Sequence, residues 1–200
     1  YDKSEAHEFE KIEGRVDFEQ VDFEYLPDIP VLRKFDLHVN PGETIALVGH
    51  TGAGKTSITA LIARFYDIQS GHVRVDGYDV RDINLSSLTR RMSVVLQEPY
   101  LFSGTIASNI RYGRLDATDE DVRQAAIAVG ADEFVMELPE GYSTQLHERG
   151  QNLSVGQRQL ISFARALVAD PAILVLDEAT ANIDTATEKV IQEALSGMLS

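Results

Sequence analysis

The fold of this 200-residue chain is indicated most strongly by eight residues, Gly49-His50-Thr51-Gly52-Ala53-Gly54-Lys55-Thr56. They match the phosphate-binding loop pattern G-x-x-x-x-G-K-[ST], known as Walker A. Thr44–Val48 is predicted to be a short buried strand before the loop, and helical apolar spacing follows from Ser57 to Phe65. Glycines let successive backbone N–H groups face one anion, and the helix start adds its positive dipole end. The stretch therefore predicts a nucleoside triphosphate site, with Lys55 on the β- and γ-phosphates and the Thr56 hydroxyl on Mg²⁺.

A second strand end carries two acids. Ile173–Leu176 is an apolar run with the length of a buried strand, and Asp177 and Glu178 follow it directly. Ligands collect at the carboxyl ends of buried parallel strands. We therefore predict that Asp177 holds Mg²⁺ and that Glu178 polarises the attacking water as general base. The alternative is that both acids begin a solvated loop, but a phosphate loop upstream requires an acid on the metal side.

Leu153–Gln157 lies at the start of a predicted helix from Ser154 to Ala169. Ser154 and Gln157 fit a capping box, which is a sufficient structural explanation for those two residues. A helix start with a hydroxyl and the closely approaching Gly156 is also a second anion site. Two anion sites about 100 residues apart suggest two nucleotides, or one nucleotide shared across a dimer.

The composition excludes several kinds of protein. The chain has no cysteine, which excludes disulfides, thiolate metal sites and cysteine nucleophiles. No stretch approaches the roughly 20 apolar residues that a spanning helix needs, and the charged segment Tyr1–Glu13 lacks the apolar core of a signal peptide. The formal net charge of −14 argues against a nucleic-acid partner, which would select clustered lysine and arginine.

The remaining pattern predicts an α/β protein with a P-loop NTPase core of mixed or parallel sheet, an N-terminal antiparallel β-subdomain and an inserted helical subdomain. Residues 1–13 are predicted to be a linker and residues 14–200 the domain, with the helical part at about 105–165. Thr118 with Asp121 predicts a helix N-cap there, and Gly130 a helix stop. The other predicted strands are Arg15–Tyr25, Val31–Val39, Val73–Val75 and Ser93–Leu96, and a last helix is predicted from Asp184 to Leu199.

Leu153–Gln157 resembles the signature of the ATP-binding cassette (ABC) family, usually LSGGQ, and the resemblance extends over nearly the whole chain. Tyr25 resembles the family's aromatic residue that stacks on adenine. Gln97 resembles the Q-loop glutamine, which contacts Mg²⁺ and the attacking water, and residues 181–184 resemble the D-loop. The exporter branch is the most similar, because Phe102–Ile106 with Asn109-Ile110 resembles the exporter stretch after the Q-loop, and Thr144–Gly150 resembles the exporter x-loop.

The resemblance implies an ATPase that binds ATP and Mg²⁺ between two such domains, identical or different, with the signature of one domain over the Walker A loop of the other. It also implies a transmembrane domain upstream of Tyr1, a position on the cytoplasmic face of a membrane, and export of a substrate. Glu148 would contact the transmembrane part. The implied nucleotide-binding residues are Tyr25, Gly49, His50, Thr51, Gly52, Ala53, Gly54, Lys55, Thr56 and Ser57, with Ser154, Gly156 and Gln157 acting in trans. The implied catalytic residues are Glu178, Gln97 and Lys55, and the implied metal ligands are Thr56, Gln97 and Asp177.

The sequence departs from the family pattern at two places. Val155 replaces the first signature glycine, which we interpret as tolerated because Ser154 and Gly156 remain. The family carries a switch histidine about 30 residues after the catalytic glutamate, and this chain has no histidine there. We therefore expect a fragment that lacks its last core strand, with weakened γ-phosphate sensing, little turnover and lowered stability.

Three other functions are open at this point. A non-transport member acting on DNA or ribosomes is disfavoured by the acidic composition and by the short interval between the Walker A loop and the signature. A regulatory module that binds nucleotide without hydrolysing it is disfavoured by the presence of Glu178. A small-molecule kinase would have no use for Leu153–Gln157.

Overall fold

The computed structural model describes residues 6–50, 52–177 and 185–198 of the chain. The chain divides into two compact units, residues 1–92 and residues 93–200. Among the described residues, no helix combines the length and the apolar character that crossing a membrane requires.

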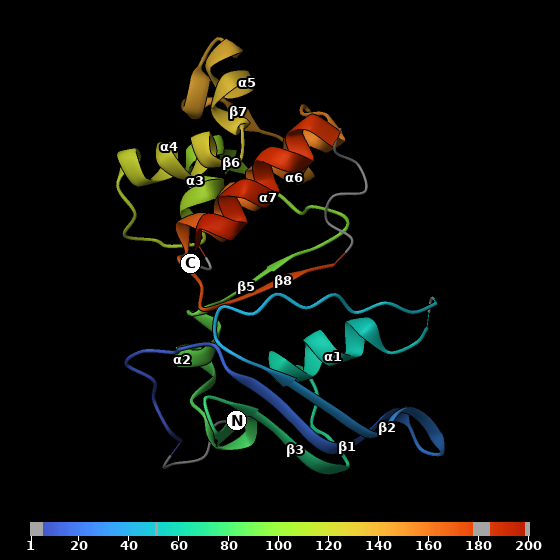
Figure 1. Ribbon diagram of the computed structural model, residues 1–200. Coiled ribbons are helices and arrows are strands. Elements are labelled where there is room, and N and C mark those ends of the chain that lie inside the picture. The colour runs from blue at the N-terminus through green and yellow to red at the C-terminus, as the bar shows by residue number, and fades with distance from the viewer. Residues whose placement is uncertain (1–5, 51, 178–184, 199–200) are drawn as a thin grey trace. The chain divides into compact units, whose positions relative to one another are not determined.

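The first unit is built on a four-stranded sheet in the order β2-β1-β3-β4 (Figure 1). Its strands are β1 (Val16–Leu26), β2 (Ile29–Val39), β3 (Ser70–Val75) and β4 (Tyr78–Asp79), and every neighbouring pair is antiparallel. Phe18, Val21 and Phe23 of β1 are buried, as the apolar alternation predicts. The strand predictions at 15–25, 31–39 and 73–75 are confirmed, and β2 begins two residues earlier than predicted.

Two helices complete the first unit. Helix α1 (Lys55–Ile62) packs against β3, which confirms a helix after the phosphate loop although it starts and ends earlier than the predicted 57–65. A short helix α2 (Leu85–Thr89) follows the single turn η1 (Val80–Asp82). Sequence analysis missed α2, whose signal is Asn84: the side chain of this N-cap residue accepts a hydrogen bond from the backbone N–H of Ser87.

The prediction of a buried strand at Thr44–Val48 is wrong. The segment forms no strand, and Val48 is 93 % exposed. A strand exists only where a neighbouring strand accepts and donates its backbone hydrogen bonds. None of the described strands pairs with this segment, so its apolar character alone does not make it a strand.

The segment before β1 makes ordered contacts in the first unit. The ring of His7 stacks on that of Tyr78, with centroids 3.8 Å apart and planes 6° from parallel. Ile12 is buried, at 5 % exposure. The Asp76 carboxylate accepts three backbone N–H groups from residues 13–15, at 2.7, 3.1 and 2.8 Å. These contacts anchor residues that the polar sequence pattern described only as a linker.

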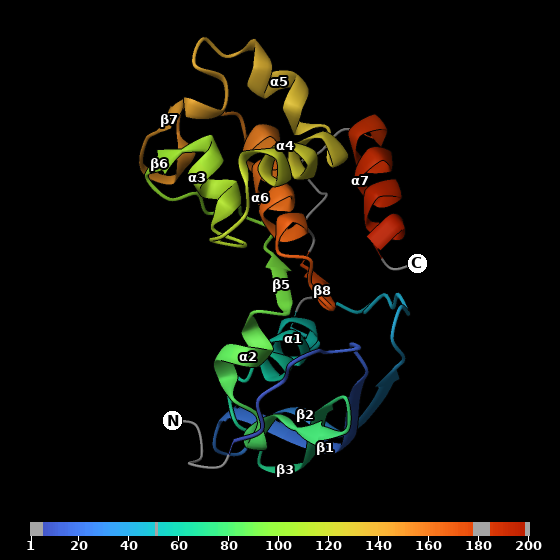
Figure 2. The same ribbon diagram turned by 90° about the vertical axis from the view of Figure 1, so that its left-hand side faces the viewer.

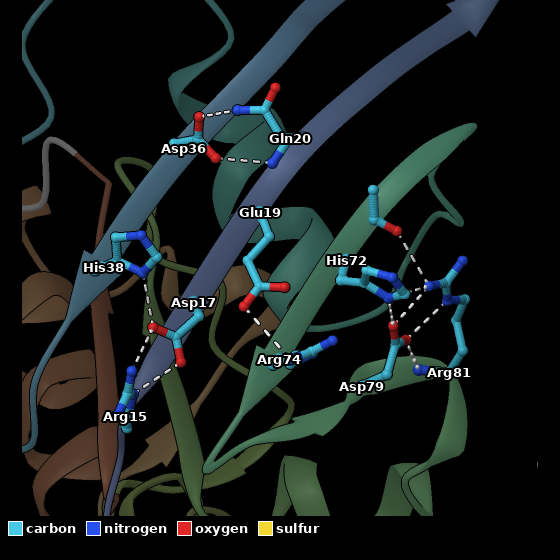
Figure 3. A network of polar contacts seen from close by, with 11 residues as sticks. Arg15, Asp17, Glu19, Gln20, Asp36, His38, His72, Arg74, Asp79 and Arg81 are labelled. Carbon is cyan, nitrogen blue, oxygen red and sulfur yellow. Dashed lines mark hydrogen bonds and ion pairs between the residues drawn. The ribbon is translucent and has the colours of Figure 1, made fainter.

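One face of the antiparallel sheet carries charged side chains (Figure 3). The residues opposed in register across the four strands are His38, Asp17, Arg74 and Asp79. At one end of this row, Arg81 Nε donates to Asp79 Oδ1 at 2.7 Å, and His72 Nδ1 lies 2.8 Å from Asp79 Oδ2. Burial alone would raise the pKa of Asp79, but hydrogen bonds from Arg81 and His72 outweigh it and hold the pKa well below its usual range.

Asp17 is the second hydrogen-bonded carboxylate of this face and is buried, at 4 % exposure. Arg15 Nε donates to its Oδ2 at 2.8 Å, and His38 Nδ1 lies 2.9 Å from its Oδ1 (Figure 3). Burial acts to raise the pKa of Asp17, and the bonds to Arg15 and His38 together lower it. The ionised form of both carboxylates is therefore part of the folded first unit.

The second unit is mainly helical, with α6 (Val155–Val168) in contact with three other helices (Figures 1 and 2). These are α3 (Ile106–Arg111), α4 (Asp119–Ala128) and α5 (Ala131–Glu137), while α7 (Thr185–Met198) contacts α4. Strand β5 (Met92–Val95) pairs with β8 (Ile173–Leu176). Both predicted strands are confirmed, and β5 begins and ends one residue earlier than predicted. Between α5 and α6 lie the turns η2 (Gly141–Ser143) and η3 (Glu148–Gly150) and the strand β7 (Gln145–Leu146), which pairs with β6 (Gly104–Thr105).

The predicted helix caps of this unit are confirmed. Thr118 and Asp121 form a reciprocal capping box at the start of α4. Gly130 lies between α4 and α5 with a left-handed φ of 74°, a conformation that a glycine adopts at little cost. The start of the predicted last helix, Asp184, lies outside the described residues.

Candidate functional site

Two glycines of the phosphate loop have backbone conformations that other residues rarely adopt. Gly52 and Gly54 have φ values of 84° and 88°, and Gly54 is the N-cap residue of α1. A Cβ atom on Gly54 would lie 3.1 Å from Leu32 Cδ2 and 3.3 Å from Val31 Cγ1. The loop thus turns tightly into the helix and against β2, and its backbone N–H groups at the start of α1 have no earlier turn to bond to. Thr51 lies outside the described residues.

Lys55 is the first residue of α1, and its ammonium group lies over its own loop. Lys55 Nζ donates to the carbonyl oxygen of Gly49 at 2.7 Å and to that of His50 at 3.1 Å. The loop itself turns through a bond from the Ala53 N–H to the His50 carbonyl, at 3.1 Å. A cation at this place neutralises an anion bound at the helix start.

Tyr25 lies beside α1. Its hydroxyl oxygen is 2.8 Å from Ser57 Oγ, although the two residues are 32 positions apart. Ser57 is buried at 5 % exposure, whereas Tyr25 is 47 % exposed. The structure therefore brings the predicted base-stacking residue into contact with the helix that follows the phosphate loop.

In the second unit, Gln97 and Asp177 follow paired strands. The N–H of Asp177, directly after β8, donates to the carbonyl of Val95, the last residue of β5, at 3.0 Å. Gln97 follows Val95 by two residues, so the two predicted metal ligands stand at adjacent strand ends. Glu178 and residues 181–184 lie outside the described residues.

The predicted capping box of the signature segment is confirmed. Ser154 Oγ accepts from the Gln157 N–H at 3.2 Å, and Gln157 Oε1 accepts from the Ser154 N–H at 3.0 Å. Val155 is the first residue of α6 and is 43 % exposed. Its position has no positive φ, so the backbone does not require the glycine that family members usually carry there.

Two side chains of α6 that sequence analysis missed hold the residues on either side of Gln97. Gln159 is fully buried, and its Nε2 donates to the carbonyl of Leu96 at 3.2 Å. Arg165 Nη1 donates to the carbonyl of Tyr100 at 2.9 Å. The available signal was Gln159, a polar residue four positions before Phe163 on the same buried face of the helix.

Arg165 makes two further hydrogen bonds, both to Asn109. Its Nε donates to the Asn109 carbonyl at 2.9 Å and its Nη2 to Asn109 Oδ1 at 2.8 Å. The same Oδ1 accepts the Phe102 N–H at 2.9 Å, and the guanidinium carbon lies 5.3 Å from the Phe102 ring centroid. Burial lowers the pKa of Arg165 to about 10, which leaves it charged at neutral pH. The helix that begins at the signature thus carries the cation that orders the segment after Gln97.

The segment predicted to contact a transmembrane part lies at η3, in the same unit. Glu148 is its first residue, and Arg149 next to it has a positive φ of 56°. The guanidinium carbon of Arg149 lies 5.9 Å from the ring centroid of Tyr100, which is itself 48 % exposed. The turn that carries Glu148 therefore lies beside an exposed aromatic residue.

A sequence profile of the family described as ABC transporter matches residues 32–181. The chain belongs to the ABC transporter family. The match includes the phosphate loop, Gln97, the signature and the acids after β8. Membership confirms the α/β P-loop NTPase fold class predicted from the sequence, and the antiparallel sheet together with the helices agrees with it.

Known members resemble the chain over almost its whole length. It is 54 % identical over 99 % of its length to the ABC transporter ATP-binding protein YknV of Bacillus subtilis, of which it covers 33 %. It is 48 % identical over 94 % of its length to a fatty acid ABC transporter ATP-binding/permease protein of Mycobacterium tuberculosis, of which it covers 30 %. A bacterial Atm1-family ABC exporter solved with ATP bound matches with a TM-score of 0.96 and 38 % identity, over all of this chain and 35 % of that one. The chain thus spans about a third of the length of the relatives that it matches.

Proposed function

We propose that this chain binds ATP and Mg²⁺ and hydrolyses ATP to power the export of a substrate across a membrane. The observation that carries the proposal is the phosphate loop, where left-handed Gly52 and Gly54 precede helix α1 and the Lys55 ammonium lies over the loop. Such a loop collects backbone N–H groups, a helix dipole and a cation around one polyphosphate. Membership of the ABC transporter family supports the choice of ATP.

In the proposed reaction, water attacks the γ-phosphate in line with the leaving oxygen. Glu178 accepts a proton from the water, and the Gln97 side chain orients it. Lys55 and the loop amides stabilise the charge that develops on the phosphate oxygens. Tyr25 stacks on the adenine, and its contact with Ser57 supports that role.

Magnesium, when bound, neutralises charge on the phosphate oxygens. The Thr56 hydroxyl, the Asp177 carboxylate and the Gln97 amide oxygen are the hard oxygen donors that this ion prefers. The adjacency of the β5 and β8 ends that precede Gln97 and Asp177 fits a shared ion.

The proposed active state contains two such domains. Ser154, Gly156 and Gln157 of one domain would bind the nucleotide held by the Walker A loop of the other. We further propose a transmembrane domain on the same protein, upstream of Tyr1, contacted through Glu148, with this chain on the cytoplasmic face. The ATP-binding/permease names of several relatives support that arrangement.

Phosphate release from MgATP, measured against protein concentration, tests this function on a form of the chain extended past Ser200 to include a switch histidine, because we expect little turnover from residues 1–200 alone. Because the proposed site needs two domains, the rate per molecule should rise with concentration. Glu178→Gln should lower turnover by about 10²–10⁴-fold. Glu193→Gln makes the same change at a 69 % exposed side chain of α7 and should leave the rate unchanged. Turnover that is insensitive to Glu178 would refute the catalytic role, and ATP binding without turnover would favour a regulatory domain.

A further inference from the structure

Tyr66 lies against the ring of Tyr25 in the first unit. The two centroids are 5.0 Å apart and the ring planes are 85° apart, an edge-to-face contact. Phe23 contacts Tyr25 at 4.8 Å and Tyr66 at 5.9 Å, so the three rings form one cluster. Phe23 is 2 % exposed, whereas Tyr25 and Tyr66 are 47 % and 49 % exposed. The cluster therefore rests on a buried ring and leaves aromatic surface of Tyr25 open to a ligand.

The loop between α1 and β3 is tied down on both sides of Tyr66. Before it, the Phe65 N–H donates to the Ala60 carbonyl at 2.9 Å and closes the end of α1. After it, Gln69 exchanges two hydrogen bonds with the backbone of Glu24, at 2.9 and 3.1 Å. Because Glu24 separates the other two rings along β1, the loop is fixed to the strand at the cluster itself.

We propose that Tyr66 is a positioning residue for base recognition, holding the Tyr25 ring at the orientation in which an adenine stacks on it. The inference rests on the proposed function, which makes Tyr25 the base-stacking residue. The Ser57 hydroxyl fixes the far end of the Tyr25 ring, and Tyr66 fixes its tilt. A ring held in its binding orientation does not lose freedom when the ligand arrives, which raises affinity.

The contribution of Tyr66 is restricted to the base. Its ring touches the aromatic cluster, while the groups expected to bind phosphate are those of the loop at Gly49–Thr56. One edge-to-face contact is worth about two- to tenfold in an equilibrium constant. Removing the Tyr66 ring should therefore weaken the binding of ATP by that factor and leave the binding of a base-free polyphosphate unchanged.

Competition against a fluorescent ATP analogue tests the proposal on the whole chain. ATP and inorganic tripolyphosphate, which has the phosphates but no base, are the two competitors. Tyr66→Ala is compared with Tyr66→Phe, which keeps the ring, and with Phe65→Ala as the matched control. Phe65 is 71 % exposed and, within the described chain, makes no ring contact with the cluster. Tyr66→Ala is also made in a Tyr25→Ala background, and the urea midpoint of each variant reports its folding.

We expect Tyr66→Ala to weaken the binding of ATP about two- to tenfold. Tripolyphosphate binding should stay within twofold, Tyr66→Phe should restore ATP affinity, and Tyr66→Ala should have no further effect once Tyr25 is alanine. The proposal is overturned if Tyr66→Ala leaves ATP affinity unchanged, if it weakens both competitors equally, or if its effect persists without Tyr25. If the unchanged chain binds neither competitor, the proposed function itself fails, and this inference fails with it.

Discussion

Replacing Arg165 by alanine should destabilise the second unit by about 1.5–6 kcal/mol. The substitution removes three hydrogen bonds from a charged donor, at 2.8 to 2.9 Å, each worth about 1.5–3 kcal/mol. The free-energy cost of burying the charged guanidinium partly offsets this contribution. A pKa lowered to about 10 corresponds to a burial cost of about 3 kcal/mol relative to an ordinary arginine. The expected loss of stability is the contribution of the three hydrogen bonds minus this burial cost. Alanine leaves the carbonyl oxygens of Tyr100 and Asn109 without this donor.

Amide hydrogen exchange of α3 and α6 measures this loss in the second unit alone. The matched control is Arg123→Ala, since Arg123 lies 3.3 Å from Asp132 with 52 % of its side chain exposed. Such an exposed pair contributes about 0–1 kcal/mol. Arg165→Lys should fall between the two, because one ammonium cannot reach the acceptors that the forked guanidinium reaches.

Protection factors in α3 and α6 that change equally for Arg165→Ala and Arg123→Ala would refute the reasoning. They would show that the buried guanidinium contributes no more than a surface ion pair. A full recovery by Arg165→Lys would refute the geometric part, because charge alone would then be sufficient.

Three further outcomes can be measured by urea or thermal unfolding. Folding lowers the pKa of Asp79, so as the pH falls the unfolded chain binds a proton at this carboxylate first, near pH 4. The stability of the fold should therefore decrease as the pH drops below about 5. Asp79→Asn should flatten this part of the curve of urea midpoint against pH. Gly113→Ala should lower the free energy of unfolding by more than about 2 kcal/mol, because its Cβ would lie 2.0 Å from the Arg165 carbonyl oxygen. Gly77→Ala, at a positive φ of 83° with open space around it, should lower it by only about 1 kcal/mol. Equal thermal midpoints for the two variants would contradict this. Ser154→Ala should lower stability by about 1 kcal/mol because it removes the N-cap of α6, and Ser154→Asp should keep most of that stability in the same urea titration.

Several features followed from neighbouring residues alone. The capping boxes at Thr118 and Ser154 each join residues three positions apart, so the sequence specifies them locally. The apolar alternation of β1 likewise reflects the burial of its own side chains, and in β8 the buried residues are Ile173 and Val175. The phosphate loop could be predicted because its glycines, Lys55 and the following helix are contiguous.

Other features depend on residues that only the folded chain brings together. The bond from Gln159 to Leu96 spans 63 positions, and that from Arg165 to Tyr100 spans 65. A polar side chain on a helix face gives no local sign of which distant carbonyl it will reach. Sequence analysis therefore found Gln97 by resemblance and missed the two α6 side chains that hold the residues around it.

The sequence by itself determined the family, the phosphate loop, the helix caps and most of the strands, because these depend on composition and on spacings of a few residues. The tertiary structure decided that Thr44–Val48 is not a strand, that Tyr25 contacts Ser57 and Tyr66, and which buried side chains order the segment after Gln97. The physical reason is that strand pairing, ring contacts and buried hydrogen bonds each require a partner. That partner is chosen by the fold, and the apolar or polar character of one segment does not name it.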